Sequence, residues 1–162
     1  DLPISINISS TSLLHSDFID ELKLLWQKYP FDISKIELEV TEGAFIRSDL
    51  AINQCNELKA LGFTLCLDDF GTGHSSLSYL LKLPMDVIKI DRSFVIAIPE
   101  DHKALILLQG IIDICHELGK SIVVEGVETQ EQIDFLKKQN VDVVQGFFYF
   151  KPMPVNDIIA IN

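Results

Sequence analysis

Acidic and amide side chains recur at the ends of short apolar runs in this sequence of 162 residues. Six such runs are present, and each ends in polar residues with an oxygen or nitrogen that could bind a ligand. These run-end residues are Asn7, Glu39, Asp68, Asp69, Lys89, Glu125 and Gln145. If the runs are parallel strands, the side chains gather at one edge of a sheet, where α/β proteins bind ligands. Oxygen ligands gathered in that place indicate a metal site.

The adjacent acids Asp68 and Asp69 give the clearest indication of the chemistry. A turn at the end of a strand can direct both carboxylates to one ion or to two neighbouring ions. Two divalent ions about 3.5–4 Å apart are a standard arrangement for phosphoester hydrolysis. A Gly-containing loop, residues 70–73, follows the two acids. The sequence therefore points to metal-assisted chemistry on a phosphate.

Lys89 would lie on the same strand face as Val87 and Asp91, in the expected interior. It could orient or deprotonate a water molecule, neutralise a phosphate oxygen, or simply pair with Asp91. Glu37 and Glu39 also share a face, and they need a cation or a partner unless that face is solvated. Taken singly, the other run-end residues could be ordinary turn caps. Their recurrence favours a common site.

Six units, each a strand followed by a helical segment, must position these residues. Strands are expected at 3–9, 35–41, 63–68, 86–91, 121–125 and 143–148. Helices are expected near 13–28, 49–61, 75–82, 102–118, 129–138 and 155–161. Gly62 and Gly119 are placed to end two helices, and Thr129 with Gln132 to open another.

The apolar spacing predicts which side chains two of these helices bury. The first helix would bury Leu14, Phe18, Leu22, Leu25 and Trp26. The fourth helix would bury Leu105, Leu108, Ile111, Ile112 and Cys115. Alternating strands and helices imply parallel pairing, in a doubly wound sheet or most of a (β/α)8 barrel. Polar residues at nearly every strand end favour an incomplete barrel of about six β/α units.

Composition indicates a single domain with covered strands, since 48% of the residues are hydrophobic and the mean hydropathy is +0.26. No apolar run approaches the roughly 18 residues that a membrane helix needs, and no signal-peptide pattern is visible. Cys55, Cys66 and Cys115 are expected to be buried thiols of a reducing cytoplasm. The net charge of −11 argues against DNA or RNA as the main partner.

Several other site classes are excluded by missing motifs. The sequence has no G-x-G-x-x-G after its first strand and no Walker loop, which disfavours nucleotide-binding folds. The Asp69-Phe-Gly71 string lacks the other protein-kinase motifs. His116-Glu117 lacks the second histidine of a zincin, and no serine or cysteine lies in a nucleophile elbow.

Five motifs occur in order along the whole chain: Glu39-Val-Thr-Glu42, Asp68-Asp-Phe-Gly-Thr-Gly-His-Ser-Ser-Leu77, Lys89-Ile-Asp91 with Arg92-Ser-Phe94, Val124-Glu-Gly-Val-Glu-Thr129 and Gln145-Gly-Phe. Together they resemble the EAL domain family of bacterial cyclic-di-GMP phosphodiesterases. The resemblance implies a TIM-like barrel that uses Mg²⁺ or Mn²⁺. It also implies hydrolysis of cyclic-di-GMP to linear pGpG, in second-messenger signalling.

The resemblance further implies a two-metal site. Asn7, Glu39 and Asp68 would bind the first ion, and Asp68 would bridge to the second. Asp69 would serve that second ion, and Glu125 would hold it directly or through water.

Other roles follow from the same resemblance. Lys89 would contact and activate the attacking water, with Gln145 supporting the same site, and Glu128 would have a supporting role. Glu42 would anchor the loop near Phe70–Leu77, which lies close to the homodimer interface of the family. A sensory or GGDEF-type domain is expected upstream.

The sequence departs from the family pattern in three respects. The Glu-Ala-Leu signature is absent, so residues 1–162 are expected to be the C-terminal two-thirds of one EAL-type domain, with two β/α units preceding Asp1. Gly43 and His74 replace residues that are more often Ser and Tyr. An incomplete barrel exposes strand edges, so we expect residues 1–162 alone to be unstable, to oligomerise, or to need completion.

Two alternatives to the phosphodiesterase remain open. One is a catalytically inactive EAL-like domain that acts as a cyclic-di-GMP receptor or a protein-interaction module. The other is a general (β/α) metabolic enzyme that uses one metal and a lysine.

Overall fold

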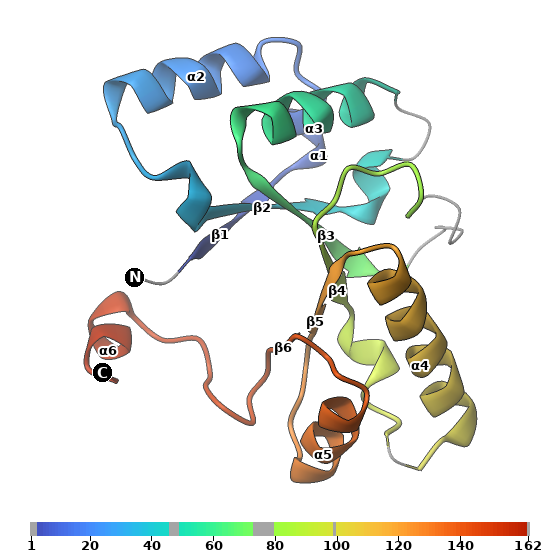
Figure 1. The fold of residues 1–162 in the computed structure, drawn as a ribbon. Coiled ribbons are helices and arrows are strands. Elements are labelled where there is room, and N and C mark those ends of the chain that lie inside the picture. The colour runs from blue at the N-terminus through green and yellow to red at the C-terminus, as the bar shows by residue number, and fades with distance from the viewer. Residues whose placement is uncertain (1–2, 46–48, 73–79, 99, 162) are drawn as a thin grey trace.

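The computed structural model describes residues 3–45, 49–72, 80–98 and 100–161. Six strands form one parallel sheet (Figure 1): β1 (Ile4–Ile8), β2 (Ile36–Thr41), β3 (Thr64–Phe70), β4 (Val87–Ile90), β5 (Ser121–Val124) and β6 (Val143–Val144). Their order in the sheet follows their order in the chain. A doubly wound sheet reverses its order at a switch point, whereas a barrel does not. The structure therefore confirms the prediction of an incomplete barrel.

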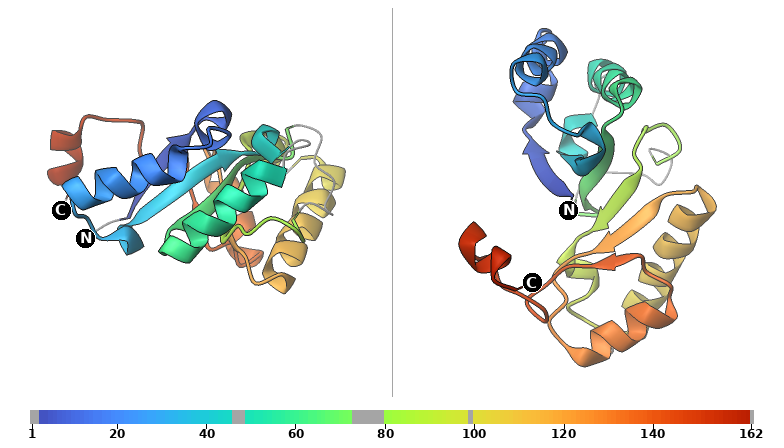
Figure 2. Two further views of the ribbon diagram at one scale, coloured as in Figure 1. Left: turned by 90° about the horizontal axis from the view of Figure 1, so that it is seen from above. Right: turned by 60° about the vertical axis from the view of Figure 1, so that its left-hand side comes forward.

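Helices cover the outer side of this curved sheet, except for the C-terminal helix, which stands apart from it on the open side (Figure 2). The α-helices are α1 (Ser10–Leu13), α2 (Phe18–Lys28), α3 (Asp49–Leu61), α4 (His102–Glu117), α5 (Gln130–Lys138) and α6 (Val155–Ile159). Among the described residues, short 3-10 helices lie at strand ends: η1 (Ile33–Lys35), η2 (Glu42–Phe45) and η4 (Arg92–Phe94). Helix η2 follows β2 directly and η4 follows β4 after one residue, at the edge where the sequence places its polar residues.

Most sequence predictions of local structure are confirmed. In α4, Leu108, Ile111, Ile112 and Cys115 are buried, with Leu105 packed against them. The capping box of Thr129 and Gln132 opens α5. Gly62 and Gly119 have φ of 101° and 68°, the left-handed geometry expected where a helix stops. All three cysteines are free and buried.

The first predicted helix is wrong in its extent and in part of its buried face. The chain forms two helices, α1 and α2, with residues 14–17 between them. The carbonyl of His15 in this break accepts a hydrogen bond of 2.8 Å from the buried side chain of Gln54 on α3. Leu14 and Leu25 are exposed, while Phe18, Leu22 and Trp26 are partly buried. A tertiary contact thus stabilises a break that the helical spacing alone did not indicate.

The sixth strand is also shorter than predicted. Pairing ends at Val144, because the chain then turns against the backbone of Val127. A Cβ at Gly146 would lie 2.0 Å from the Val127 carbonyl oxygen, so only glycine permits this approach. Of the predicted helix at 75–82, residues 80–82 form turns and the rest lies outside the described residues.

Two aspartates tie neighbouring strands together at the end of the sheet opposite the polar residues. Asp86, just before β4, accepts a hydrogen bond from the Leu65 amide of β3 and forms an ion pair with Lys59 of α3. Asp142, just before β6, accepts a hydrogen bond from the Ile122 amide of β5. The same device therefore joins β3 to β4 and β5 to β6.

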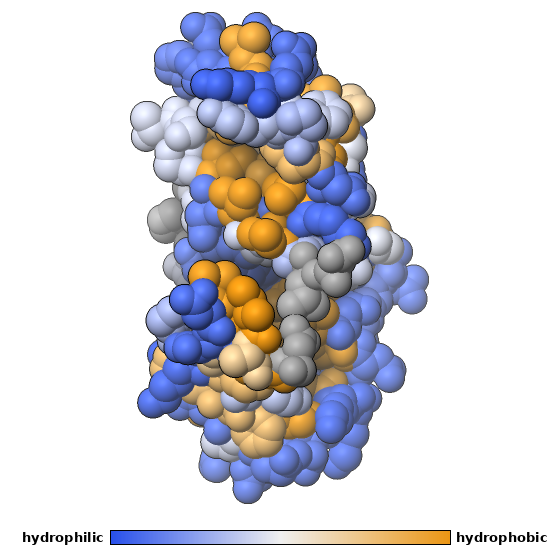
Figure 3. Space-filling model, turned by 90° about the vertical axis from the view of Figure 1, so that its left-hand side faces the viewer, coloured by the Kyte–Doolittle hydropathy of each residue, from blue (hydrophilic) through white to orange (hydrophobic). Residues whose placement is uncertain are grey.

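The sheet is open between its outer strands, β1 and β6. Ile4 and Ile6 of β1 are 60% and 46% exposed, and hydrophobic surface gathers on this open side (Figure 3). A groove of about 620 Å³ next to β1 is lined mainly by apolar side chains of β1, β2 and α2. None of the described helices has the length and apolar character that a membrane crossing requires.

Candidate metal centre

Lys89 of β4 lies at the centre of the predicted site. Its ammonium nitrogen is 2.9 Å from Glu39 Oε1, 3.1 Å from Asp68 Oδ1 and 2.8 Å from Glu125 Oε1. Lys89 and Glu39 are 6% and 7% exposed, so both charges lie in the interior and stabilise one another. Strands β2 and β3 and the end of β5 each contribute one carboxylate to this cluster.

Asp91 is not the partner of Lys89, contrary to one reading left open by the sequence. Its carboxylate instead accepts a hydrogen bond of 2.9 Å from the Ser93 amide at the start of η4. Burial acts to raise the pKa of Asp91, but hydrogen bonds from Ser93 and Arg92 and the charge of Arg92 lower it overall.

A bulge in β3 brings both neighbouring aspartates toward Lys89. Leu67 pairs with Ile88 and Phe70 with Ile90, so Asp68 and Asp69 together lie opposite one residue, Lys89. Asp69 has a φ of 56°, in the left-handed region that aspartate tolerates better than most residues. A regular strand would point these side chains to opposite faces.

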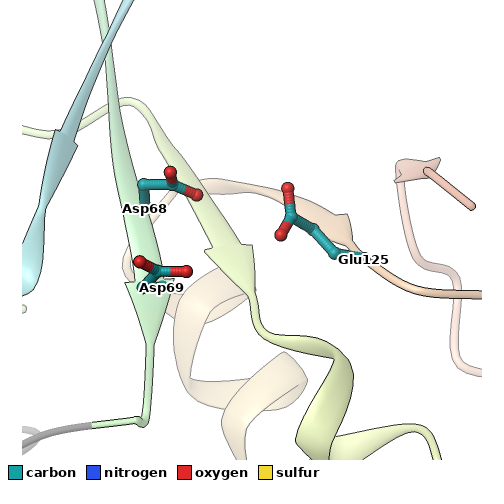
Figure 4. Close-up of side chains that lie close together, drawn as sticks. All are labelled: Asp68, Asp69 and Glu125. Atoms are coloured by element: carbon teal, nitrogen blue, oxygen red, sulfur yellow. The ribbon is translucent and has the colours of Figure 1, made fainter. Parts of the chain in front are cut away.

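Three carboxylates meet closely enough to hold a cation. Asp68, Asp69 and Glu125 each have an oxygen within 4.8 Å of the others, and their side chains point toward a common space (Figure 4). Asp68 Oδ1 is in contact with the ammonium of Lys89 at 3.1 Å. Carboxylate oxygens gathered in one place are the ligands that a hard divalent cation such as Mg²⁺ or Mn²⁺ prefers.

The electrostatics of the cluster favour a charged lysine and disfavour a charged Asp69. Burial acts to lower the pKa of Lys89, but hydrogen bonds to Glu125 and Glu39 and the negative charge around it raise the pKa overall. Burial, followed by the charges of Asp68 and Asp91, raises the pKa of Asp69. Lys89 therefore stays an ammonium, and a cation beside Asp69 would favour the charged form of this carboxylate.

Glu39 and Asn7 lie side by side in the sheet register. Glu39 reaches the cluster through Lys89 and is not one of the three clustered carboxylates. Asn7 is exposed on β1. Glu37, two residues before Glu39, accepts a hydrogen bond of 3.0 Å from the Ser5 hydroxyl.

Cys66 lies in register with Glu39 on the neighbouring strand and is buried. Burial, with the charges of Glu37 and Glu39, raises the pKa of its thiol to about 12. The thiol therefore stays protonated and is not a nucleophile.

Glu42 is buried in η2 and contacts the chain just beyond the metal candidates. Its Oε2 accepts a hydrogen bond of 3.2 Å from the Gly71 amide, two residues after Asp69. Glu42 therefore contacts the first turn of the loop that leaves β3, and residues 73–77 of the loop lie outside the described residues.

A cavity of about 690 Å³ opens beside Glu125. Arg92 and Lys151 place two cations in its lining, with Gln145 and the aromatic Phe147. Glu128 also lines it, 3.9 Å from Arg92, in an exposed contact. The acids Asp91 and Glu125 line it as well, so an anionic group would fit only next to Arg92 and Lys151, while the Phe147 ring offers a face to a planar group. The sequence analysis missed Lys151, although a lysine next to the aromatic run Phe147–Phe150 was a usable signal.

Parallel strands in chain order define a barrel-type protein, and the acids and the lysine at their carboxyl ends suggest that it uses a divalent cation. The chain belongs to the EAL family, because the model of the EAL domain matches residues 1–152.

Relatives with stated functions are found among bacterial signalling proteins. The chain is 37% identical over 155 residues to "Cyclic di-GMP phosphodiesterase NbdA" of Pseudomonas aeruginosa, covering 95% of this chain and 20% of that protein. It thus spans about a fifth of this relative.

Solved EAL structures have the same fold. The Bd1971 EAL enzyme in its cAMP- and cyclic-di-GMP-bound form superposes with a TM-score of 0.95 at 35% identity, covering 99% of this chain and 43% of that one. Klebsiella pneumoniae BlrP1 in a manganese and cyclic-di-GMP complex gives a TM-score of 0.82 at 30% identity, covering 90% and 38%.

Proposed function

We propose that this chain is the larger part of a phosphodiesterase domain that hydrolyses cyclic-di-GMP to linear pGpG with two divalent ions, Mg²⁺ or Mn²⁺. The supporting observation is the cluster of Asp68, Asp69 and Glu125 around the ammonium of Lys89. Relatives that carry this activity in their names add support.

The metal ligands would come from two groups of residues. Asp68, Asp69 and Glu125 offer three oxygens in one place, and Glu39 and Asn7 lie on the adjoining strands. Divalent ions held there would stabilise the negative charge of the phosphate and make water more acidic.

The residues of the chain would bind and orient the reactants. In the hydrolysis, water oxygen bonds to phosphorus, one P–O ester bond breaks, and the released sugar oxygen takes a proton. Lys89 is held protonated, so it would donate a hydrogen bond to the water or to a phosphate oxygen and would not remove a proton. Gln145 lies at the edge of the cavity, where its amide could hydrogen-bond to the substrate.

The cavity next to Glu125 suits the substrate class. Arg92 and Lys151 could pair with phosphate oxygens, and the Phe147 ring offers a face for a purine. The negative net charge of the chain does not oppose this assignment, because cations would lie between the carboxylates and the phosphate.

The proposal also covers the oligomeric state of the protein, its regulation and its location in the cell. The loop near Phe70–Leu77 would contribute to a homodimer, and an upstream sensory or GGDEF-type domain would regulate the site. Free buried cysteines are compatible with a reducing cytoplasm.

The test is incubation of the protein that contains this chain with cyclic-di-GMP and Mg²⁺, followed by chromatography for pGpG. Wild-type protein should form pGpG, whereas Asp68→Ala and Lys89→Ala should each abolish it. Retained turnover in both variants would overturn the site assignment. Binding of cyclic-di-GMP without turnover by wild-type protein would favour the receptor alternative.

A further inference from the structure

Two glycines with left-handed backbones follow the clustered carboxylates within two residues. Gly71 comes two residues after Asp69 and has a φ of 96°. Gly126 comes immediately after Glu125 and has a φ of 69°. The directions in which the chain leaves β3 and β5 are therefore set at these two positions.

Both glycines are in contact with the same 3-10 turn, η4, which follows the intervening strand β4. A Cβ at Gly71 would lie 2.3 Å from Cε2 of the Phe94 ring. A Cβ at Gly126 would lie 2.2 Å from the Cβ of Arg92. No methyl group fits at either place, so the turn touches the backbone on both of its sides.

The turn itself is held firmly. Asp91 caps it through the Ser93 amide, and the Phe94 amide donates to the Asp91 carbonyl at 3.1 Å. The next residue, Val95, is fully buried, and its carbonyl accepts a hydrogen bond of 3.0 Å from the buried side chain of Gln132 on α5. A turn anchored in this way resists displacement from either side.

Glu42 holds Gly71 from the other direction. Its carboxylate accepts the Gly71 amide hydrogen bond, while the Phe94 ring packs against the same residue. The chain leaving β3 is thus fixed between elements that follow β2 and β4. Asp69, with its own left-handed φ, lies two residues earlier in this fixed segment.

We propose that η4 is a spacer that sets the distance between the carboxylates of Asp69 and Glu125, with Phe94 as the positioning residue for Asp69. The backbone and Cβ of Arg92 act in the same way on Gly126 and hence on Glu125. This inference rests on the proposed metal site, and it assigns to an apolar ring the task of keeping two of its ligands at binding distance.

The test measures Mn²⁺ binding to the protein that contains this chain, from the electron paramagnetic resonance signal of free Mn²⁺. Phe94→Ala should weaken binding roughly 10- to 100-fold, as loss of other supporting residues does around metal sites. Phe94→Leu should weaken it less, because part of the contact remains. Gly126→Ala should also weaken binding, because its methyl group would displace the chain next to Glu125.

The matched control is Phe63→Leu. Phe63 is buried just before β3, at the opposite end of the sheet, whereas Phe94 is partly buried, so this variant loses at least as much core packing without touching the turn. It should bind Mn²⁺ like wild-type protein. An equal loss of affinity in Phe63→Leu and Phe94→Leu would overturn the proposal, because general destabilisation would then explain both.

Hydrogen exchange gives a second readout that needs no metal. The amides of residues 69–72 should exchange faster in Phe94→Ala than in wild-type protein or in Phe63→Leu. Unchanged exchange would overturn the spacer role whatever happens to Mn²⁺ binding. Faster exchange in a protein whose wild-type form binds no Mn²⁺ would support the spacer and contradict the proposed metal-dependent function.

Discussion

The ammonium of Lys89 lies 2.8 Å from Glu125 Oε1, and this contact joins β4 to the residue that follows β5. Without the ammonium, the carboxylates of Glu39, Asp68 and Glu125 would face one another. Lys89→Met should therefore lower the free energy of unfolding by about 3 kcal/mol, as breaking other buried ion pairs does. Urea denaturation in the presence of a metal chelator measures this loss.

Lys59→Met is the matched control for Lys89→Met. Lys59 pairs with Asp86, but both side chains are about one-third exposed, so the expected cost is about 0–1 kcal/mol. Mg²⁺ should recover part of the stability of Lys89→Met and little of that of Lys59→Met. Equal costs for the two variants would show that the cluster does not depend on the charge of Lys89.

Asp69 should make the metal-free protein less stable as the pH rises. Its pKa is raised in the folded state, so the folded protein holds this proton more tightly than the unfolded chain does. Stability is then lost between the ordinary aspartate pKa of 3.8 and the raised value. Asp69→Asn should raise the Tm at neutral pH in chelator and leave it unchanged below pH 3.8, as thermal unfolding by circular dichroism would measure.

The affinity of Asp69 for a metal ion should instead rise as the pH rises. Protons compete with the cation at a higher pH than they would for an ordinary aspartate. Titrations of Mn²⁺ at several pH values should show this part of the pH dependence in wild-type protein but not in Asp69→Asn. In the thermal-unfolding experiment, a lower Tm of Asp69→Asn than of wild-type protein at neutral pH in chelator would contradict the raised pKa of Asp69.

Asp142 should contribute to stability without affecting the site. Asp142→Ala leaves the buried Ile122 amide without its 2.8 Å hydrogen bond, which costs about 1–3 kcal/mol. Asp134→Ala, which removes an exposed contact within α5, should cost less than about 0.5 kcal/mol. Urea denaturation tests both, and pGpG formation per folded molecule should match wild type in both. A loss of turnover in Asp142→Ala would show coupling between the two ends of the strands.

The exposed edge of β1 should make residues 1–162 associate when they are produced by themselves. Unpaired strand edges with apolar side chains pair with other chains. Ile6→Lys, which puts a charge on an exposed position of this edge, should reduce the association. Size-exclusion chromatography with light scattering measures it. A monomeric wild-type chain that unfolds cooperatively would contradict the expectation that an incomplete barrel is not a stable monomer by itself.

The strand and helix order was predictable because periodicity and turn residues act locally. The bulge at Asp68 and Asp69 was not, because strand alternation sends adjacent residues to opposite faces and only the pairing with β4 shows otherwise. The break between α1 and α2 depends on Gln54, which is distant in sequence. The early end of β6 depends on Gly146 against Val127, another contact that no local pattern reports.

The candidate site was predictable in its residue types more than in its contacts. Acids and a lysine at strand ends indicate a common edge, but strand face alone suggested Asp91 as a partner for Lys89. The observed partners lie on other strands, where register and curvature bring them together. The contact of Phe94 with Gly71 had no signal in the sequence beyond the glycine itself.

Sharing one ammonium among three carboxylates also constrains how related sequences can diverge. In a relative in which only the lysine is replaced, the full repulsion among Glu39, Asp68 and Glu125 would remain. In a relative in which only one acid is replaced, the charge of the lysine would be partly uncompensated. The four positions should therefore change together over evolution. Relatives that lack a lysine at this position are expected to lack at least one of the three acids as well.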